Sequence, residues 1–256
     1  MEQRLTAVLS QIKTACEDIF AAHLVGVYVH GSLALGCFTW ETSDVDFLVV
    51  TDELPSQDEK ERFLARLLEI DRSGPPKGLE MSVVLEKDCR DFCYPTPFSL
   101  HFSHGHLQEC EEHLKEYCGY MNGTGPDLAA HFTITRHTGI VLCGKPIAEV
   151  FGEVPREAYL DSIRGDIEDA REDIQTNTMY VLLTLCRVLA YQRDGLVLSK
   201  RQGGEWGLAH LPEKYAGLVK AALEAYSGAQ TFALTEEQQR LLPAYADDLL
   251  AQIYQG

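Results

Sequence analysis

The sequence predicts two domains of different fold class, an α/β domain over residues 1–154 and an all-α domain over residues 155–256. In the first part, short apolar and β-branched runs alternate with helical patterns, as is typical of an α/β domain. From about residue 156 onward, helical patterns follow one another, separated by turns that contain Gly, Ser or Pro. A chain of 256 residues suits one large or two modest domains.

The elements of the α/β domain are predicted from the periodicity of apolar residues. Apolar residues recur at helical spacing over the first 20 residues, and a β-branched run ends at Gly31-Ser32. Strands at 44–50 and 79–85 flank a helix over 57–71. Residues 89–125 are irregular or partly helical, and 128–144 continue a helical pattern that stops at Gly144-Lys145-Pro146. The second domain contains helices over 157–175, 178–194, 212–227 and 235–255.

Charge and composition restrict the possible partners. The formal net charge is −17, which disfavours nucleic-acid binding through phosphates and would attract a cationic small molecule, although acidity also keeps proteins soluble. No apolar run reaches the length of a membrane span, and the N-terminus does not resemble a signal peptide. The eight cysteines form no disulfide-like framework. We therefore expect a cytoplasmic protein with reduced thiols that contacts no membrane, and we expect a monomer.

Two aspartates stand close together at the start of a predicted strand. Asp44 and Asp46 are two residues apart, so both side chains point to one face of the strand. Neighbouring carboxylates repel unless a cation lies between them, and oxygen ligands suit Mg²⁺ completed by substrate phosphates. Gly31 lets the backbone approach a phosphate, and Ser32 adds a hydroxyl and an N–H donor. The alternative is a pair of solvated aspartates at a strand end.

Glu80 is a third carboxylate of interest. In the strand over 79–85, Glu80 and Ser82 point away from the apolar face. If this strand lies beside the aspartate strand, Glu80 can serve as general base for a substrate hydroxyl or as a metal ligand. Otherwise it is a strand-end glutamate that faces water.

With these residues in view, the chain resembles a known family. The run Tyr28–Ser32 followed by Ser43–Val50 is similar to the signature of polymerase-β-like nucleotidyltransferases. Further matches along the chain resemble the aminoglycoside adenylyltransferases that modify streptomycin and spectinomycin; they are Leu79–Ser82, Tyr94-Pro95, Pro126–Ala129, Leu182–Arg187, Ser199-Lys200, Trp206 and Leu211-Pro212. The resemblance implies a nucleotidyltransferase domain with a mixed sheet, followed by a helical bundle, with ATP and the drug in the cleft between.

The resemblance also implies a role for each matching residue. Asp44 and Asp46 match the magnesium-binding aspartates, Ser32 beside Gly31 the triphosphate-binding serine, and Glu80 the catalytic base. Three more residues match nucleotide-binding positions, and they are Asp127, Arg187 and Lys200. For Arg187 and Lys200 the alternative is an ordinary surface salt bridge.

The implied activity is Mg²⁺-dependent transfer of AMP from ATP to a hydroxyl of a cationic acceptor, with release of pyrophosphate. A tryptophan typical of family members that accept streptomycin is absent from the helix that links the domains, and a substrate-facing tryptophan is absent after Tyr94-Pro95. These absences argue against streptomycin and leave spectinomycin or another hydroxylated small molecule as the acceptor. Acidic residues at 168–173 either hold a cationic drug or form a solvated helix face. Other acceptors (a protein, an RNA or another small molecule) and a non-catalytic nucleotide-binding protein are the alternatives. The histidines and cysteine between 101 and 113 fit no closed zinc pattern, so we expect polar loop and helix residues there.

Overall fold

The computed structural model describes residues 2–228 and 230–255, and the chain divides into two compact units, Met1–Ala158 and Tyr159–Gly256. The first unit contains a five-stranded sheet in the order β5-β3-β2-β1-β7. Its strands are β1 (Leu24–Val29), β2 (Val45–Thr51), β3 (Leu79–Leu85), β5 (Leu100–Phe102) and β7 (Ile140–Gly144). Because β2 and β3 are parallel and every other pairing is antiparallel, the sheet is mixed.

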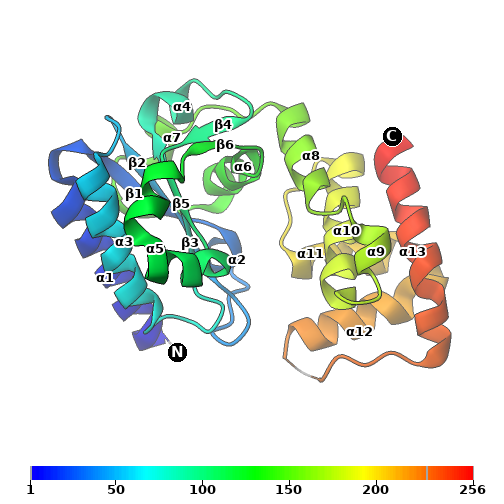
Figure 1. The fold of residues 1–256 in the computed structure, drawn as a ribbon. Helices are drawn as coiled ribbons and strands as arrows, with labels where there is room; N and C mark the ends of the chain where they lie inside the picture. Colours follow the sequence, from blue (N-terminus) through cyan, green and yellow to red (C-terminus); the bar gives the residue numbers. More distant parts are fainter. Residues whose placement is uncertain (1, 229, 256) are drawn as a thin grey trace. The chain divides into compact units, whose positions relative to one another are not determined.

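Helices cover both faces of this sheet (Figure 1). One face packs against α1 (Glu2–Phe20), α3 (Gln57–Asp71) and α5 (Leu107–Tyr120). The opposite face packs against α4 (Glu86–Arg90), α6 (Leu128–Thr138) and α7 (Ile147–Val150). Smaller elements connect these layers, namely η1 (Ala21–His23), α2 (Gly31–Ala34), η2 (His104–His106) and the two-stranded sheet of β4 (Thr96–Phe98) and β6 (Gly123–Gly125).

The alternation of side chains along β2 and β3 decides what each face of the sheet carries. Phe47 and Met81 point into the core beneath α1, α3 and α5, whereas Leu48 and Val84 point toward α6 and α7. A helix, α3, connects β2 to β3, as a parallel pair requires. This helix begins at a capping box, in which Ser56 and Glu59 satisfy each other's backbone N–H groups.

Two local predictions were wrong, and a third was incomplete. Residues 140–144 form the edge strand β7 and not the end of a helix, because Gly139 ends α6 and the β-branched Ile140 and Val141 pair with β1. The stretch 89–125, predicted to be irregular or partly helical, contains α5 and also three short strands, β4, β5 and β6, that were not predicted. The predicted helix over 157–175 is interrupted between Gly165 and Ala170.

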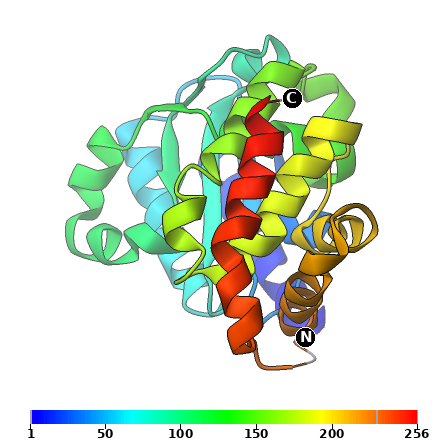
Figure 2. The same ribbon diagram turned by 90° about the vertical axis from the view of Figure 1, so that its right-hand side faces the viewer.

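The second unit consists of helices joined by turns in its described residues. These helices are α8 (Arg156–Gly165), α9 (Ala170–Asp173), α10 (Thr178–Asp194), α11 (Lys200–His210), η3 (Glu213–Tyr215), α12 (Ala216–Tyr226) and α13 (Glu236–Gln255). The central α10 is buried along most of its length, with α13 beside it (Figure 2). The helix α11 was not predicted; it lies close to α10 because a Cβ on Gly204 or Gly207 would clash with Leu183 or Cys186.

Two further findings bear on the sequence-based expectations. All eight cysteines are free thiols. None of the helices in the described part of the chain combines the length and the apolar character that a membrane crossing needs.

Candidate active site

Three carboxylates converge at one end of the parallel strand pair. In the register of β2 and β3, Asp46 lies directly beside Glu80, and Asp44 precedes β2. One carboxylate oxygen from each residue lies within 4.8 Å of the others, and all three residues are partly buried. At such separations, two unit negative charges repel by about 3 kcal/mol at the effective dielectric of a protein surface. A cation between the three carboxylates would relieve this repulsion, so the group could hold a metal ion.

The chemistry of these donors fits Mg²⁺. Mg²⁺ prefers oxygen ligands at about 2.1 Å, which places opposite ligands roughly 4.2 Å apart. Adjacent ligands of an octahedral ion lie roughly 3 Å apart. The oxygens of Asp44, Asp46 and Glu80, which lie within 4.8 Å of one another, would therefore move inward to bind one ion. Partial burial leaves room for water or phosphate oxygens to complete the shell. In the described parts of the chain, no other group of His, Cys, Asp or Glu side chains converges in this way.

The turn at Gly31 is in close contact with the carboxylate of Asp46. Gly31 has a φ of +60°, and a Cβ placed there would lie 1.8 Å from Oδ2 of Asp46. The backbone N–H of His30 donates to the carbonyl of Asp46 at 3.0 Å, which joins the end of β1 to the start of β2. A side chain at position 31 is therefore excluded both by the left-handed backbone conformation and by the carboxylate.

Ser32 lies in the first turn of α2, immediately after Gly31. Its hydroxyl oxygen is buried and has no hydrogen-bond partner among the described residues. The first N–H groups of a helix also have no acceptor within the helix. A buried hydroxyl without a partner costs free energy, so this position is suited to gain a hydrogen bond from a ligand.

Neutral histidines lie over the same face of the sheet, and sequence reasoning missed them. His30 is buried, and its ring lies 4.6 Å from the ring of His131 in α6. Burial, with a smaller effect of His131, lowers the pKa of His30 well below its usual value. The imidazole next to Gly31 is therefore uncharged at neutral pH. Its position directly before the Gly-Ser turn is the one sequence signal that could have drawn attention to it.

His101 belongs to the same face, because Ser82 hydrogen-bonds its Nδ1 at 3.0 Å and Ser82 follows Glu80 by two residues. Burial lowers the pKa of His101 to about 4, and the carboxylate of Asp127 opposes this lowering. Asp127 itself lies at the N-cap position of α6, exposed, with Gly125 packed against its carboxylate. The structure thus places Asp127 close to His101 on the sheet face that carries Glu80.

Arg187 and Lys200 lie near each other in the helical unit. A Cβ on Gly203 would lie 3.0 Å from Cα of Arg187, and Lys200 precedes Gly203 by about one helical turn. Arg187 donates to Asp166 at 2.6 Å, while its Nε is buried and has no partner in the described residues. The ammonium of Lys200 lies 4.6 Å from the centre of the Tyr180 ring. Arg187 therefore forms a salt bridge, which was the alternative to nucleotide binding in the sequence analysis. Its Nε–H donates no hydrogen bond to the described residues.

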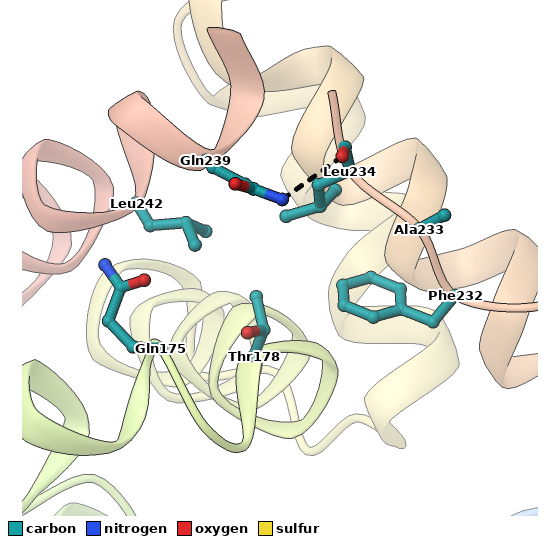
Figure 3. A pocket seen from close by; sticks show the side chains of 7 residues that line it. All are labelled: Gln175, Thr178, Phe232, Ala233, Leu234, Gln239 and Leu242. Atoms are coloured by element: carbon teal, nitrogen blue, oxygen red, sulfur yellow. Dashed lines mark hydrogen bonds between the residues drawn. The ribbon is translucent and has the colours of Figure 1, made fainter. Parts of the chain in front are cut away.

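The acidic residues at 168–173 lie on the surface of the helical unit. Glu168, Asp169, Glu172 and Asp173 are all exposed, and Arg171 of the same segment pairs with Asp247. A cavity of about 440 Å³ lies nearby in the helical unit, lined by Gln175, Thr178, Phe232, Ala233, Leu234, Gln239 and Leu242 (Figure 3). Its lining contains side-chain amides and apolar groups, and none of the predicted site residues belongs to it.

The fold and the carboxylate site together define a nucleotidyltransferase. Residues 9–105 match a family described as the nucleotidyltransferase domain, and residues 149–252 match the aminoglycoside adenylyltransferase C-terminal domain. The chain therefore matches, part by part, the two domains that its resemblance to the aminoglycoside adenylyltransferases predicted. Its mixed sheet and following helical unit are likewise those that the resemblance implies.

Similar proteins match most of the length of this chain. A spectinomycin 9-adenylyltransferase of Staphylococcus aureus is 26% identical over 83% of this chain and 81% of its own length. One from Campylobacter jejuni is 24% identical over 86% of this chain and 84% of its own. A crystal structure of a spectinomycin adenyltransferase from Enterococcus, with ATP and spectinomycin, superposes with a TM-score of 0.78 at 18% identity. That superposition covers 97% of this chain and 99% of the other.

Proposed function

We propose that this protein transfers AMP from ATP to a hydroxyl of a spectinomycin-type aminocyclitol and releases pyrophosphate. The observation that carries the proposal is the convergence of Asp44, Asp46 and Glu80 beside the Gly31 turn. The names of the relatives, which are spectinomycin 9-adenylyltransferases, support the choice of acceptor. The net charge of −17 is consistent with a cationic acceptor.

Asp44 and Asp46 would hold Mg²⁺, with Glu80 close enough to contribute to its shell. When bound, Mg²⁺ supplies positive charge that offsets the charge developing on the phosphates during transfer. The Gly31 turn would bring backbone N–H groups and the Ser32 hydroxyl to the phosphates of ATP. We further propose that Asp127, Arg187 and Lys200 contribute to nucleotide binding.

In the reaction that we propose, a carboxylate oxygen of Glu80 accepts the proton of the acceptor hydroxyl. The hydroxyl oxygen then forms a bond to the α-phosphorus of ATP, and the bond between the α-phosphorus and the bridging oxygen breaks. Pyrophosphate leaves with that oxygen. The location of Glu80 beside Asp46 on adjacent strands supports this role, because a general base must reach the proton within hydrogen-bonding distance.

The test is to incubate purified protein with ATP, Mg²⁺ and separately spectinomycin, streptomycin and other aminocyclitols, and to follow pyrophosphate. We expect release with spectinomycin. Asp46→Asn and Glu80→Gln should each lower kcat by at least about 10²-fold. Asp52→Asn is the matched control, because Asp52 follows the opposite end of β2 and is half exposed. Full turnover by Asp46→Asn would contradict the metal assignment, and full turnover by Glu80→Gln would contradict the assignment of the base.

A further inference from the structure

A fourth carboxylate, Asp71, lies behind the active-site strands. Asp71 is the last residue of α3, and only 7% of its surface is exposed. A negative charge at the C-terminal end of a helix is unfavourable, and a buried carboxylate needs hydrogen-bond donors. Asp71 finds them outside its helix. Its Oδ1 accepts the backbone N–H of Leu79 at 2.8 Å, and its Oδ2 lies 3.5 Å from Nδ1 of His104.

The residue that Asp71 holds is directly joined to the catalytic machinery. Leu79 is the first residue of β3, and Glu80 follows it. The carbonyl of the preceding residue, Gly78, accepts the N–H of Val45 at 3.1 Å, and Val45 stands between Asp44 and Asp46. The short segment 78–79 is thus fixed on one side to α3 and on the other to the start of β2.

The backbone turn at Gly78, just before β3, is packed closely against Asp71. Gly78 has a φ of +80°, and a Cβ there would lie 2.8 Å from Oδ1 of Asp71 and 2.5 Å from Nδ1 of His104. Backbone and carboxylate are therefore in close contact at this corner. A shift of the Asp71 side chain must shift Leu79, and with it the start of the strand that carries Glu80.

We propose that Asp71 is a positioning residue for the reaction, one that fixes Glu80 relative to Asp44 and Asp46 by holding the N–H of Leu79. The inference rests on the proposed function, because it assigns Asp71 a role in placing the three carboxylates. The positioning role depends on the oxygen of Asp71 that accepts the N–H of Leu79, and it does not depend on the negative charge of Asp71. Asparagine keeps that acceptor oxygen, and its amide N–H can donate to His104, so Asp71→Asn should preserve the arrangement.

The experiment compares Asp71→Ala and Asp71→Asn with wild type. Glu69→Ala is the matched control, since Glu69 is near the same helix end but exposed and paired only with Arg66 in the contacts of the described chain. Three quantities are measured on each purified protein: kcat with KM for ATP, Mn²⁺ binding by EPR without nucleotide, and the melting temperature. Mn²⁺ binding reports the arrangement of the carboxylates without turnover.

A misplacement of about 1 Å can cost roughly 10²-fold in rate, so Asp71→Ala should lower kcat by about that factor and weaken Mn²⁺ binding, with KM for ATP nearly unchanged. Asp71→Asn and Glu69→Ala should retain both properties. Unchanged kcat and Mn²⁺ binding in folded Asp71→Ala would overturn the inference, since Asp71 would then serve stability alone. An equal loss in Asp71→Asn would also overturn it, because charge and not position would be responsible.

If Asp71→Ala does not fold, Asp71→Glu decides the question. Asp71→Glu keeps the charge but moves the acceptor oxygen by the length of one methylene. A lowered kcat in Asp71→Glu together with a wild-type kcat in Asp71→Asn supports the positioning role. An unchanged kcat in Asp71→Glu contradicts it. The wild-type protein distinguishes a failure of the proposed function from a failure of this inference. A wild-type protein that neither binds Mn²⁺ nor releases pyrophosphate overturns both proposals, whereas an active wild type with an equally active Asp71→Ala overturns this inference alone.

Discussion

Replacing Gly31 with alanine tests how closely the turn and Asp46, the carboxylate that we propose to bind metal, depend on each other. The new Cβ would lie 1.8 Å from Oδ2 of Asp46, whereas ordinary contact begins near 3.4 Å. The carboxylate, the turn or both must therefore move by about 1.6 Å in total. Asp46 is the carboxylate that pairs in register with Glu80, so such a movement separates the three carboxylates.

The same change also strains the backbone, and the chain contains a control for that strain. An L-residue in the left-handed region costs about 1–2 kcal/mol. Gly36 has a φ of +70°, close to the +60° of Gly31, but a Cβ at Gly36 would meet no described atom within 4 Å. Gly36→Ala therefore introduces the backbone strain without touching Asp46. The two variants should lose similar free energies of unfolding from strain, and only Gly31→Ala should lose the carboxylate geometry.

We expect kcat to fall by at least about 10²-fold in Gly31→Ala, which corresponds to roughly 2.7 kcal/mol in the activation barrier. Gly36→Ala should retain kcat within a small factor. The assay is pyrophosphate release with ATP, Mg²⁺ and spectinomycin at a temperature where both variants are folded by circular dichroism. Equal kcat values for the two variants would refute the reasoning, because the clash with Asp46 would then have no consequence.

Two other predictions concern the histidines and the helical core. Because burial lowers the pKa of His101 from 6.5 to about 4, only the unfolded chain takes up this proton between those values, so the free energy of unfolding should fall as pH falls from 6.5 toward 4. In urea unfolding at several pH values, His101→Gln should lose part of this dependence, and an unchanged slope would contradict the assignment. Tyr245→Phe removes a buried hydroxyl that donates to the Leu182 carbonyl at 2.8 Å, and should cost about 1–2 kcal/mol of stability with kcat unchanged. Tyr254→Phe, at a half-exposed site, should cost nothing measurable, and equal losses in the two variants would argue against the buried hydrogen bond.

Much of the first unit could be predicted from local patterns. The strands around Phe47 and Val83 are apolar runs between turn signals, and the helix between them has a capping sequence at Ser56. A strand, a helix and a second strand in succession indicate a parallel pair. The interpretation of Glu80 required that its strand lie beside the strand of Asp44 and Asp46. The structure has β2 and β3 paired in this way.

The errors have a common physical cause, which is that pairing partners distant in sequence decide the outcome. Ile140 and Val141 follow a helix and could continue it, but β1 offers them backbone partners at Val29 and Tyr28. The helix α11 contains three glycines and reads weakly as a helix, yet these glycines allow it to lie close against α10. In both cases tertiary contacts outweigh local propensity.

The same reasoning separates the parts of the active site that sequence can predict from those it cannot. Asp44 and Asp46 share a face because of the strand period alone, so their pairing is visible in the sequence. Asp71 is separated from them by a helix, and nothing in its surroundings in the sequence shows that its carboxylate turns back to meet Leu79. The residues that we propose to perform the chemistry lie in short motifs, whereas the positioning that we propose for Asp71 acts through the backbone corner at Gly78. Substitutions at Asp71 therefore test whether the three carboxylates are held by their own strands or by the contacts behind them.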